Sequence, residues 1–331
     1  MQIHRYQENP ILTPRDECWW EQKGTLNCAA AQGRDGTIHL LYRAVGFDGI
    51  SRFGYAATRD GTTITQRPRL PVFEGDIDDP YVRLGVEDPR ITPLDGRYYI
   101  TYTQASLYEV STPPRIPNEQ APWRVRAGLL VTDDFRRFED RWRILRDIDT
   151  KDVVLFPERI GGRYALLHRI HPAIQIAYSD DLIHWDGHQT ILAPRPGTWE
   201  SERIGAGNPP LKSEVGWLLF YHANEFFERA GNKKRYRIGL AVLDVAHPER
   251  VVYRHPDPVL EPEADYERSG AVNDIVFVCG AVERDGVYYL YYGAGDGVSA
   301  VATVAKDDVL ALVRAGMKRG SDSVTSARKP G

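Results

Sequence analysis

Five runs of apolar and aromatic residues, each introduced by a turn, recur along the chain. Each run is six to eight residues long, as in DGTIHLLYRAV from Asp35 and DGVYYLYYGAG from Asp285. The turns are spaced by roughly 55 to 70 residues, and their glycines are Gly36, Gly96, Gly162, Gly216 and Gly286. A turn followed by aromatic and β-branched residues predicts a β-strand. The chain is therefore predicted to have five strands in comparable positions.

A second motif follows each run after a gap. It consists of a short strand, then an aspartate, usually after Ser, Thr or Leu, and then a turn. The five copies are SRFGYAATRDGTTI, RAGLLVTDDFRRFED, AIQIAYSDDLIHWDG, YRIGLAVLDVAHPERV and SAVATVAKDDV. Five all-β units of this size predict a β-propeller with five blades. A β-sandwich is the alternative, but both motifs occur five times in the same order, which argues against it.

The propeller accounts for the chain as a single domain, because its blades share one axis. We expect this domain to cover residues 1–319, with a short N-terminal extension and one helical segment from Asp307, DDVLALVRAGMKRG. Residues 320–331 are small and polar, and we predict that they are disordered. The proline-rich residues 111–123 are expected to form a loop over the binding face.

Composition excludes several classes of function. The 331 residues carry a formal net charge of −4, which argues against nucleic acid as a partner. No apolar run approaches the roughly 18 residues of a membrane span, and the N-terminus does not resemble a secretory signal. Cys18, Cys28 and Cys279 form no metal-binding or disulfide pattern. We predict a cytoplasmic protein without a structural metal.

One acidic motif stands immediately before the second strand run. In GVEDPR, residues 85–90, Asp88 precedes a proline and is therefore restricted to an extended or turn conformation. Asp88 is a candidate general acid. The motif is equally explained by an ordinary Asp-Pro turn in which Arg90 pairs with Glu87.

Basic and polar residues stand at equivalent strand ends in successive blades. They are Arg43, Lys151, Arg169, Lys212, His222 and Tyr236. In a propeller these positions are expected to converge on one mouth of the central channel. Each residue alone could be a solvated charge or part of a local ion pair. Several cations in one pocket would repel each other unless an anion joined them, which indicates a small anionic substrate such as phosphate.

The chain resembles glycoside hydrolase family 130, the mannoside phosphorylases and related β-mannosidases, from about residue 10 to residue 313. The matching stretches are LLYRAV, GVEDPRIT, KDVVLFPERIGGRYALLHRI, IAYSDDLIHW, RIGAGNPPLKSEVGWLLFYH, YRIGLAVLD and VFVCGAV with YLYYGAGD. The family fold is a five-bladed β-propeller, in agreement with the repeat pattern.

The resemblance also implies roles for individual residues. Asp88 matches the catalytic acid, and Arg43, Asn27 and Asp296 match residues that contact the sugar. Phosphate binding is implied for the positions Lys151, Arg169, Lys212, His222 and Tyr236. The resemblance implies no metal and no cofactor, with inorganic phosphate as a co-substrate.

The implied reaction is inverting phosphorolysis of a β-mannoside to α-mannose 1-phosphate. Phosphate is already anionic and needs no general base, so one acid and a basic cluster suffice, whereas an inverting hydrolase needs a second carboxylate to activate water. The alternatives are a β-mannosidase of the same family, a glycan-binding propeller without activity and a furanosidase-type hydrolase. The acceptor sugar, the β-1,4 or β-1,2 linkage and the formation of a homo-oligomer are left open.

Overall fold

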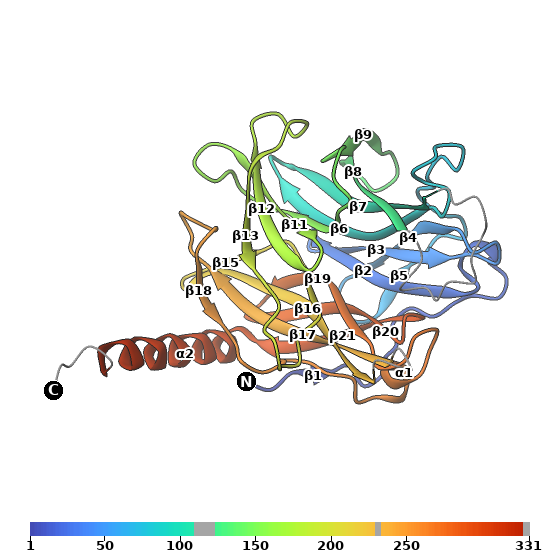
Figure 1. Cartoon of the computed structure of the whole chain (residues 1–331). Helices are drawn as coiled ribbons and strands as arrows, with labels where there is room; N and C mark the ends of the chain where they lie inside the picture. The colour runs from blue at the N-terminus through green and yellow to red at the C-terminus, as the bar shows by residue number, and fades with distance from the viewer. Residues whose placement is uncertain (109–122, 229–232, 327–331) are drawn as a thin grey trace.

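The computed structural model describes residues 1–108, 123–228 and 233–326 (Figure 1). In this part of the chain, five antiparallel sheets stand around a common axis, each built from successive strands. The first blade has the strands β2 Gly24–Gln32, β3 Ile38–Val45, β4 Ser51–Thr58 and β5 Ile64–Gln66. The second has β6 Val86–Leu94, β7 Arg97–Leu107, β8 Trp123–Thr132 and β9 Glu139–Ile144.

The remaining blades repeat this order. The third has β10 Lys151–Leu155, β11 Tyr164–Ile170, β12 Ala173–Ser179 and β13 Asp186–Leu192. The fourth has β14 Arg203–Ala206, β15 Leu211–Ser213, β16 Gly216–Glu228, β17 Lys233–Leu243 and β18 Val251–Arg254. The fifth has β19 Val276–Arg284, β20 Val287–Ala294, β21 Val298–Ala305 and the N-terminal strand β1 His4–Arg5. The predicted all-β, five-bladed propeller is confirmed.

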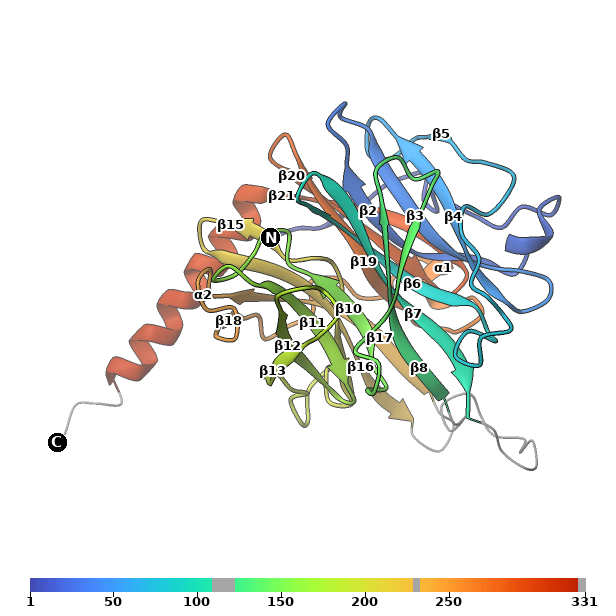
Figure 2. The same ribbon diagram turned by 90° about the horizontal axis from the view of Figure 1, so that it is seen from above.

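The ring is closed by the two ends of the propeller. Strand β1 pairs with β21, so that His4 lies opposite Thr303 and Arg5 opposite Ala302. Seen from above, the first and last blades lie next to each other (Figure 2). This pairing gives the last blade its outer strand and satisfies backbone groups that an open edge would expose.

The apolar core is divided into five clusters, one between each pair of neighbouring blades. Between the fourth and fifth blades, for example, Phe220 packs with Val278 and Tyr288. No blade encloses a core of its own, because each sheet buries both faces against its neighbours. This explains why all five units must assemble before the channel and its site exist.

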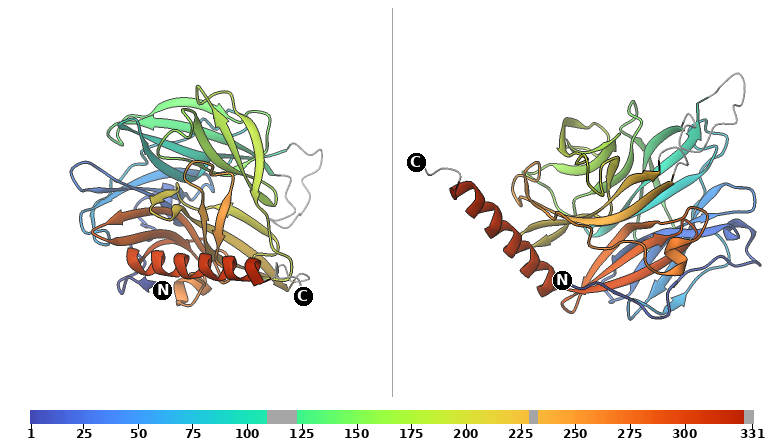
Figure 3. Two further views of the ribbon diagram at one scale, coloured as in Figure 1. Left: turned by 90° about the vertical axis from the view of Figure 1, so that its left-hand side faces the viewer. Right: turned by 60° about the horizontal axis from the view of Figure 1, so that its bottom comes forward.

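Two short helices and one long helix accompany the strands in the described residues. The short ones are η1 Trp19–Glu21 and α1 Asp265–Arg268, and the long one is α2 Lys306–Ser326. Helix α2 buries Val309, Leu310 and Val313 against the propeller and then extends away from its body (Figure 3). The helix continues past Gly320 to Ser326, whereas the sequence predicted disorder from residue 320. A helix that is already nucleated can propagate through small polar residues. Residues 327–331 lie outside the described residues.

The innermost strands of the first three blades share a β-bulge. The pairing register shifts at Asn27 in β2, at Asp88 in β6 and at Asp152 in β10. At these positions φ is 53°, 50° and 53°, a left-handed conformation that Asn and Asp adopt more readily than most residues. A bulge breaks the alternation of the pleat and re-aims a side chain. The three blades thus present one polar side chain each at the same level of the channel.

Candidate active site

A cavity of about 820 Å³ opens at the end of the channel where the innermost strands begin. All five blades contribute to its wall. The charged, polar and aromatic side chains of the wall include Asn27, Arg43, Glu87, Asp88, Lys151, Asp152, Arg169, His171, Arg203, Tyr236, Phe277 and Asp296. The expected loop of residues 111–123 lies outside the described residues except for Trp123, which begins β8 and also lines the cavity.

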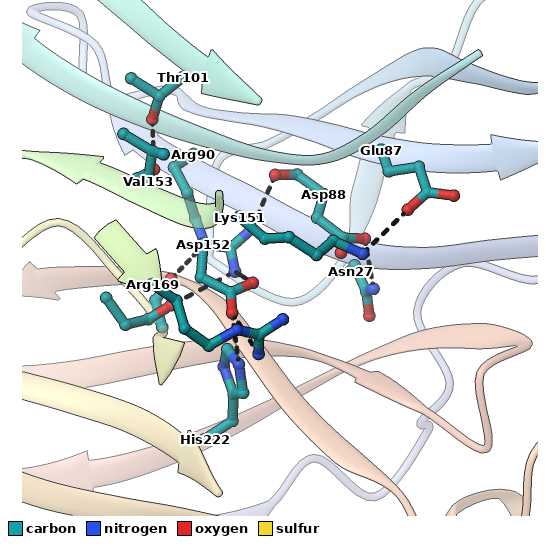
Figure 4. A network of polar contacts seen from close by, with 12 residues as sticks. Asn27, Glu87, Asp88, Arg90, Thr101, Lys151, Asp152, Val153, Arg169 and His222 are labelled. Carbon is teal, nitrogen blue, oxygen red and sulfur yellow. Dashed lines mark hydrogen bonds and ion pairs between the residues drawn. The ribbon is translucent and has the colours of Figure 1, made fainter. Parts of the chain in front are cut away.

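Asp88 lies in the cavity wall, and its bulge turns the carboxylate toward the first blade. Its Oδ1 accepts a hydrogen bond of 2.6 Å from Nδ2 of Asn27 (Figure 4). The same oxygen lies 3.6 Å from Nη1 of Arg43. Arg90 does not pair with Glu87. It is fully buried and donates to the backbone carbonyl of Asp88 at 2.8 Å. The interpretation of GVEDPR as a plain turn with a local Arg90–Glu87 pair is therefore wrong.

Glu87, the neighbouring acid, connects the two sides of the cavity. Its carboxylate accepts a hydrogen bond of 2.7 Å from Nη2 of Arg43 and lies 3.4 Å from Nζ of Lys151. Both cations are thus held at the wall by one buried carboxylate. They remain close enough to influence Asp88, which is the next residue.

The surroundings shift the proton affinity of Asp88 downward. Burial alone would raise the pKa of its carboxyl, but the positive charges of Arg43, Lys151 and Arg90, with the Asn27 hydrogen bond, lower it overall. In the unliganded cavity Asp88 is therefore ionised at neutral pH. A dianion bound beside Lys151 would offset these positive charges and raise the pKa of Asp88 again.

Asp296 shows the opposite behaviour on the same side of the cavity. It follows β20 with φ of 52° and is half-buried near Arg43. Burial raises the pKa of Asp296, the negative charges of Asp88 and Glu87 raise it further, and Arg43 opposes the shift. Two carboxyls on one side of the cavity therefore differ in proton affinity.

The third and fourth blades supply positive charge and a hydroxyl. Arg169 Nη1 lies 2.7 Å from Oδ2 of Asp152, and the guanidinium of Arg203 donates to the hydroxyl of Tyr236. Together with Lys151, the three residues Arg169, Arg203 and Tyr236 line one side of the same cavity. Three cations and a phenol within one pocket are suited to hold a small oxyanion.

Two predicted phosphate-binding residues do not line the cavity. Lys212 lies on β15 with 51% of its side chain exposed, and its Nζ is 2.6 Å from Glu158. That prediction is wrong because β14 runs away from the cavity and carries the chain to the other end of the blade before Lys212. His222 is only 1% exposed and lies one layer behind the wall, where its Nε2 is 3.2 Å from Oδ2 of Asp152.

Sequence reasoning missed Arg203, Asp152 and His171 in the cavity wall. Arg203 begins the stretch RIGAGNPPLK, of which we selected the wrong basic residue. Asp152 is the second residue of KDVVLFPE. The sequence argument considered only the cation Lys151 at the start of this strand and therefore overlooked Asp152. The signal that identifies Asp152 is its equivalence to Asp88, each an aspartate near the start of an innermost strand.

Two further findings bear on cofactors and membranes. Within the described ranges, no group of three or more His, Cys, Asp or Glu side chains is arranged to hold a metal ion. Among the same residues, no helix is both long and apolar enough to cross a bilayer. The predicted absence of a cofactor stays a prediction.

A buried acid and a cationic pocket in one cavity of the propeller suit an enzyme that cleaves a glycosidic bond with an anionic nucleophile. The family model described as β-1,4-mannooligosaccharide phosphorylase matches residues 19–315. The chain belongs to glycoside hydrolase family 130.

Curated relatives cover almost the whole chain. A 1,2-β-oligomannan phosphorylase of Thermoanaerobacter sp. (strain X514) is 37% identical over 93% of this chain and 99% of its own. A β-1,2-mannobiose phosphorylase of the same organism is 38% identical over 93% of this chain and 98% of its own. Among solved structures, a β-1,2-mannobiose phosphorylase from Listeria innocua, in complex with β-1,2-mannobiose, superposes with a TM-score of 0.80 at 28% identity. It covers 95% of this chain and 100% of its own.

Proposed function

We propose that this protein is an inverting mannoside phosphorylase that cleaves β-1,2-linked mannosides with inorganic phosphate. The products are α-mannose 1-phosphate and a sugar shortened by one mannose. The observation that carries the proposal is one buried acid, Asp88, in the same cavity as Lys151, Arg169 and Arg203. The β-1,2 linkage is supported by the names of two relatives that align over 93% of the chain.

The division of the cavity fits the two requirements of the reaction. The glycosidic oxygen needs a proton as the bond to C1 breaks, and an oxygen of phosphate forms the new bond to C1 from the opposite face. In the proposal Asp88 supplies the proton, either directly or through a sugar hydroxyl, while Asn27 and Arg43 hold its carboxyl in place. Lys151, Arg169, Arg203 and Tyr236 hold phosphate in line with C1, so that much of the rate enhancement comes from positioning.

Phosphate itself helps to prepare the acid in this scheme. Asp88 has a lowered pKa because Arg43, Lys151 and Arg90 outweigh the effect of its burial. A phosphate dianion bound at Lys151 offsets part of that positive charge and thereby favours protonation of Asp88. The proposal thus links the arrival of the nucleophile to the readiness of the acid.

Water is a poorer nucleophile in this cavity, because neither Asp152 nor Asp296, two carboxylates of the described wall, is suited to activate it. Asp152 lies on the phosphate side, but it is paired with Arg169 and His222, and these contacts lower its pKa against the effect of burial. A carboxylate with a lowered pKa is a weak general base. Asp296 lies near Arg43, on the side of the acid. These surroundings favour phosphorolysis over the hydrolysis of the related β-mannosidases.

The test is product analysis on β-1,2-mannobiose, β-1,2-mannotriose and β-1,4-mannobiose, each with and without inorganic phosphate. We expect α-mannose 1-phosphate from the β-1,2-linked substrates only, with its anomeric configuration assigned by nuclear magnetic resonance. Release of free mannose at the same rate without phosphate would show a hydrolase. Faster phosphorolysis of the β-1,4-linked substrate would refute the linkage but leave the phosphorylase activity in place. The cytoplasmic location and a homo-oligomer stay predictions.

A further inference from the structure

Asp152 is a buried, charged residue of the cavity wall to which the reaction as described assigns no task. It occupies the same β-bulge in the third blade that Asn27 and Asp88 occupy in the first and second. Its φ of 53° lies in the left-handed region, which residues other than glycine adopt uncommonly. Such a conformation at the edge of a cavity is a reason to look for a function.

The carboxylate of Asp152 is surrounded by positive or protonatable groups. Its Oδ2 lies 2.7 Å from Nη1 of Arg169 and 3.2 Å from Nε2 of His222. Its Oδ1 lies 3.8 Å from Nη2 of Arg90, and the residue is only 2% exposed. Asp152 thus binds Arg169, as Figure 4 shows, and both residues line the cavity.

The neighbouring blade leaves room for this pair of contacts. A Cβ atom at Gly205 of β14 would lie 2.2 Å from Oδ2 of Asp152 and 2.4 Å from Nε2 of His222. No side chain can occupy that position while Asp152 and His222 keep their places. The contact between the third and fourth blades is therefore built around the Asp152 carboxylate and the His222 ring.

From these contacts we infer that Asp152 is a positioning residue of the anion subsite, which holds Arg169 in the geometry that phosphate binding requires. The inference rests on the proposed function, because it names the structural support of the proposed phosphate pocket. A guanidinium has five N–H donors, so the contact with Asp152 fixes its plane and leaves donors for an anion.

Asp152 has two opposing effects on phosphate binding, and their balance decides whether its removal weakens or strengthens that binding. Its negative charge weakens the attraction of the pocket for an anion. Its contacts prevent Arg169 and Arg90, two buried guanidinium groups near one carboxylate, from repelling each other out of position. Removing one partner of a buried pair leaves the other charge uncompensated. We therefore expect loss of orientation to exceed the gain in positive charge.

The decisive variant is Asp152→Asn, because Asn also tolerates a positive φ and keeps the size of the side chain. We expect the KM for phosphate to rise about 10- to 100-fold, as for the loss of a charged hydrogen bond, with the KM for the mannoside changed less than about threefold. Asp186→Asn is the matched control: it removes the same charge from the same blade, where Asp186 pairs with Arg163 at the surface.

A double-mutant cycle tests whether Asp152 acts through Arg169. If it does, Asp152→Asn changes the KM for phosphate much less in the Arg169→Ala variant than in the wild-type protein. Full additivity would overturn the inference. Unchanged or tighter phosphate use by Asp152→Asn, with folding confirmed by circular dichroism, would overturn it as well.

Direct binding separates this inference from the proposed function. Calorimetric titration of inorganic phosphate into the resting wild-type protein, Asp152→Asn and Asp186→Asn needs no turnover. We expect weaker binding to Asp152→Asn alone. If the wild-type protein binds phosphate and Asp152→Asn weakens that binding, while mannosides are hydrolysed without phosphate, the proposed function fails and the positioning role stands. If phosphorolysis proceeds normally and the variant binds phosphate as the wild type does, the positioning role fails and the proposed function stands.

Discussion

The two sides of the cavity use the same backbone device for different purposes. On the side of the first, second and fifth blades, the bulge at Asp88 presents a carboxylate held by the neutral amide of Asn27 at 2.6 Å, with Arg43 at 3.6 Å. On the side of the third and fourth blades, the bulge at Asp152 presents a carboxylate in direct contact with Arg169 at 2.7 Å.

The difference shows that the neighbours of a carboxylate, more than its place in the fold, determine its chemistry. A carboxylate bound mainly by an amide can accept a proton when a bound anion offsets the charge around it. One that is paired directly with a guanidinium stays ionised and fixes the position of its partner. The propeller repeats the bulge, but the surroundings differ. The first blade supplies the neighbours of Asp88, whereas the third and fourth blades supply Arg169 and His222 beside Asp152.

The largest expected effect comes from removing the proton donor on the acid side. Asp88→Asn keeps the left-handed backbone and most hydrogen bonds but cannot give up a proton. We expect phosphorolysis to fall about 100- to 10,000-fold, as for the loss of general acid catalysis, with mannoside binding retained. Rates measured on β-1,2-mannobiose with saturating phosphate, together with calorimetric binding of the sugar, check this outcome.

The neighbouring acid is the control for that experiment. Glu87→Gln removes a charge next to Asp88, but Glu87 is bound to Arg43 and Lys151. We expect a smaller loss, expressed mostly in the KM for phosphate. Substantial activity in Asp88→Asn, with Glu87→Gln inactive, would identify Glu87 as the proton donor. It would contradict the contrast between Asp88 as an acid and Asp152 as a permanently ionised partner of Arg169.

An intermediate effect is expected on the phosphate side, where two basic residues of one sequence stretch differ in position. Arg203 lines the cavity, and Lys212 pairs with Glu158 at the surface. Arg203→Ala is expected to raise the KM for phosphate about 10- to 100-fold, as for the loss of a charge-assisted contact. Lys212→Ala is expected to leave it unchanged. The reverse result in phosphate saturation curves would place the anion outside this cavity.

The smallest effect concerns stability on the acid side. Burial, with Asp88 and Glu87 nearby, raises the pKa of Asp296 in the folded protein. Ionisation therefore destabilises the folded state at any pH above the pKa of the unfolded chain, about 3.9. Asp296→Asn is expected to raise the Tm at pH 7, by roughly 2–4 °C for each kcal/mol gained. The increase should vanish below about pH 4, where Asp296 is protonated in both states.

Thermal unfolding across this pH range measures the effect, and an assay at pH 7 shows its functional cost. We expect the stabilised variant to bind mannoside less well, since Asp296 lines the cavity. A lower Tm for Asp296→Asn at pH 7 would mean that its attraction to Arg43 outweighs burial. The acid side would then resemble the Asp152 side more closely than the pKa shifts indicate.

The repeat pattern along the chain is enough to predict the architecture and about half of the site. A turn followed by an aromatic strand is a local signal, and its fivefold repetition is visible without any tertiary contact. Residues at strand ends point to the channel mouth whenever the strand runs in the expected direction. For this reason Arg43, Asp88, Lys151, Arg169 and Tyr236 were placed in the cavity correctly.

The tertiary structure decided which side chains actually face the cavity. Arg203 and Lys212 belong to one stretch of sequence, but β14 carries the chain from the cavity to the other end of the blade between them. His222 lies in the middle of β16, which continues to Glu228, and Asp152 of the preceding blade stands between His222 and the cavity. The bulges at Asn27, Asp88 and Asp152 are likewise invisible in the pattern, because a bulge reverses the alternation from which side-chain direction is inferred. These features depend on the register of strand pairing within each blade and on contacts between neighbouring blades, and both bring together residues that are far apart in the sequence.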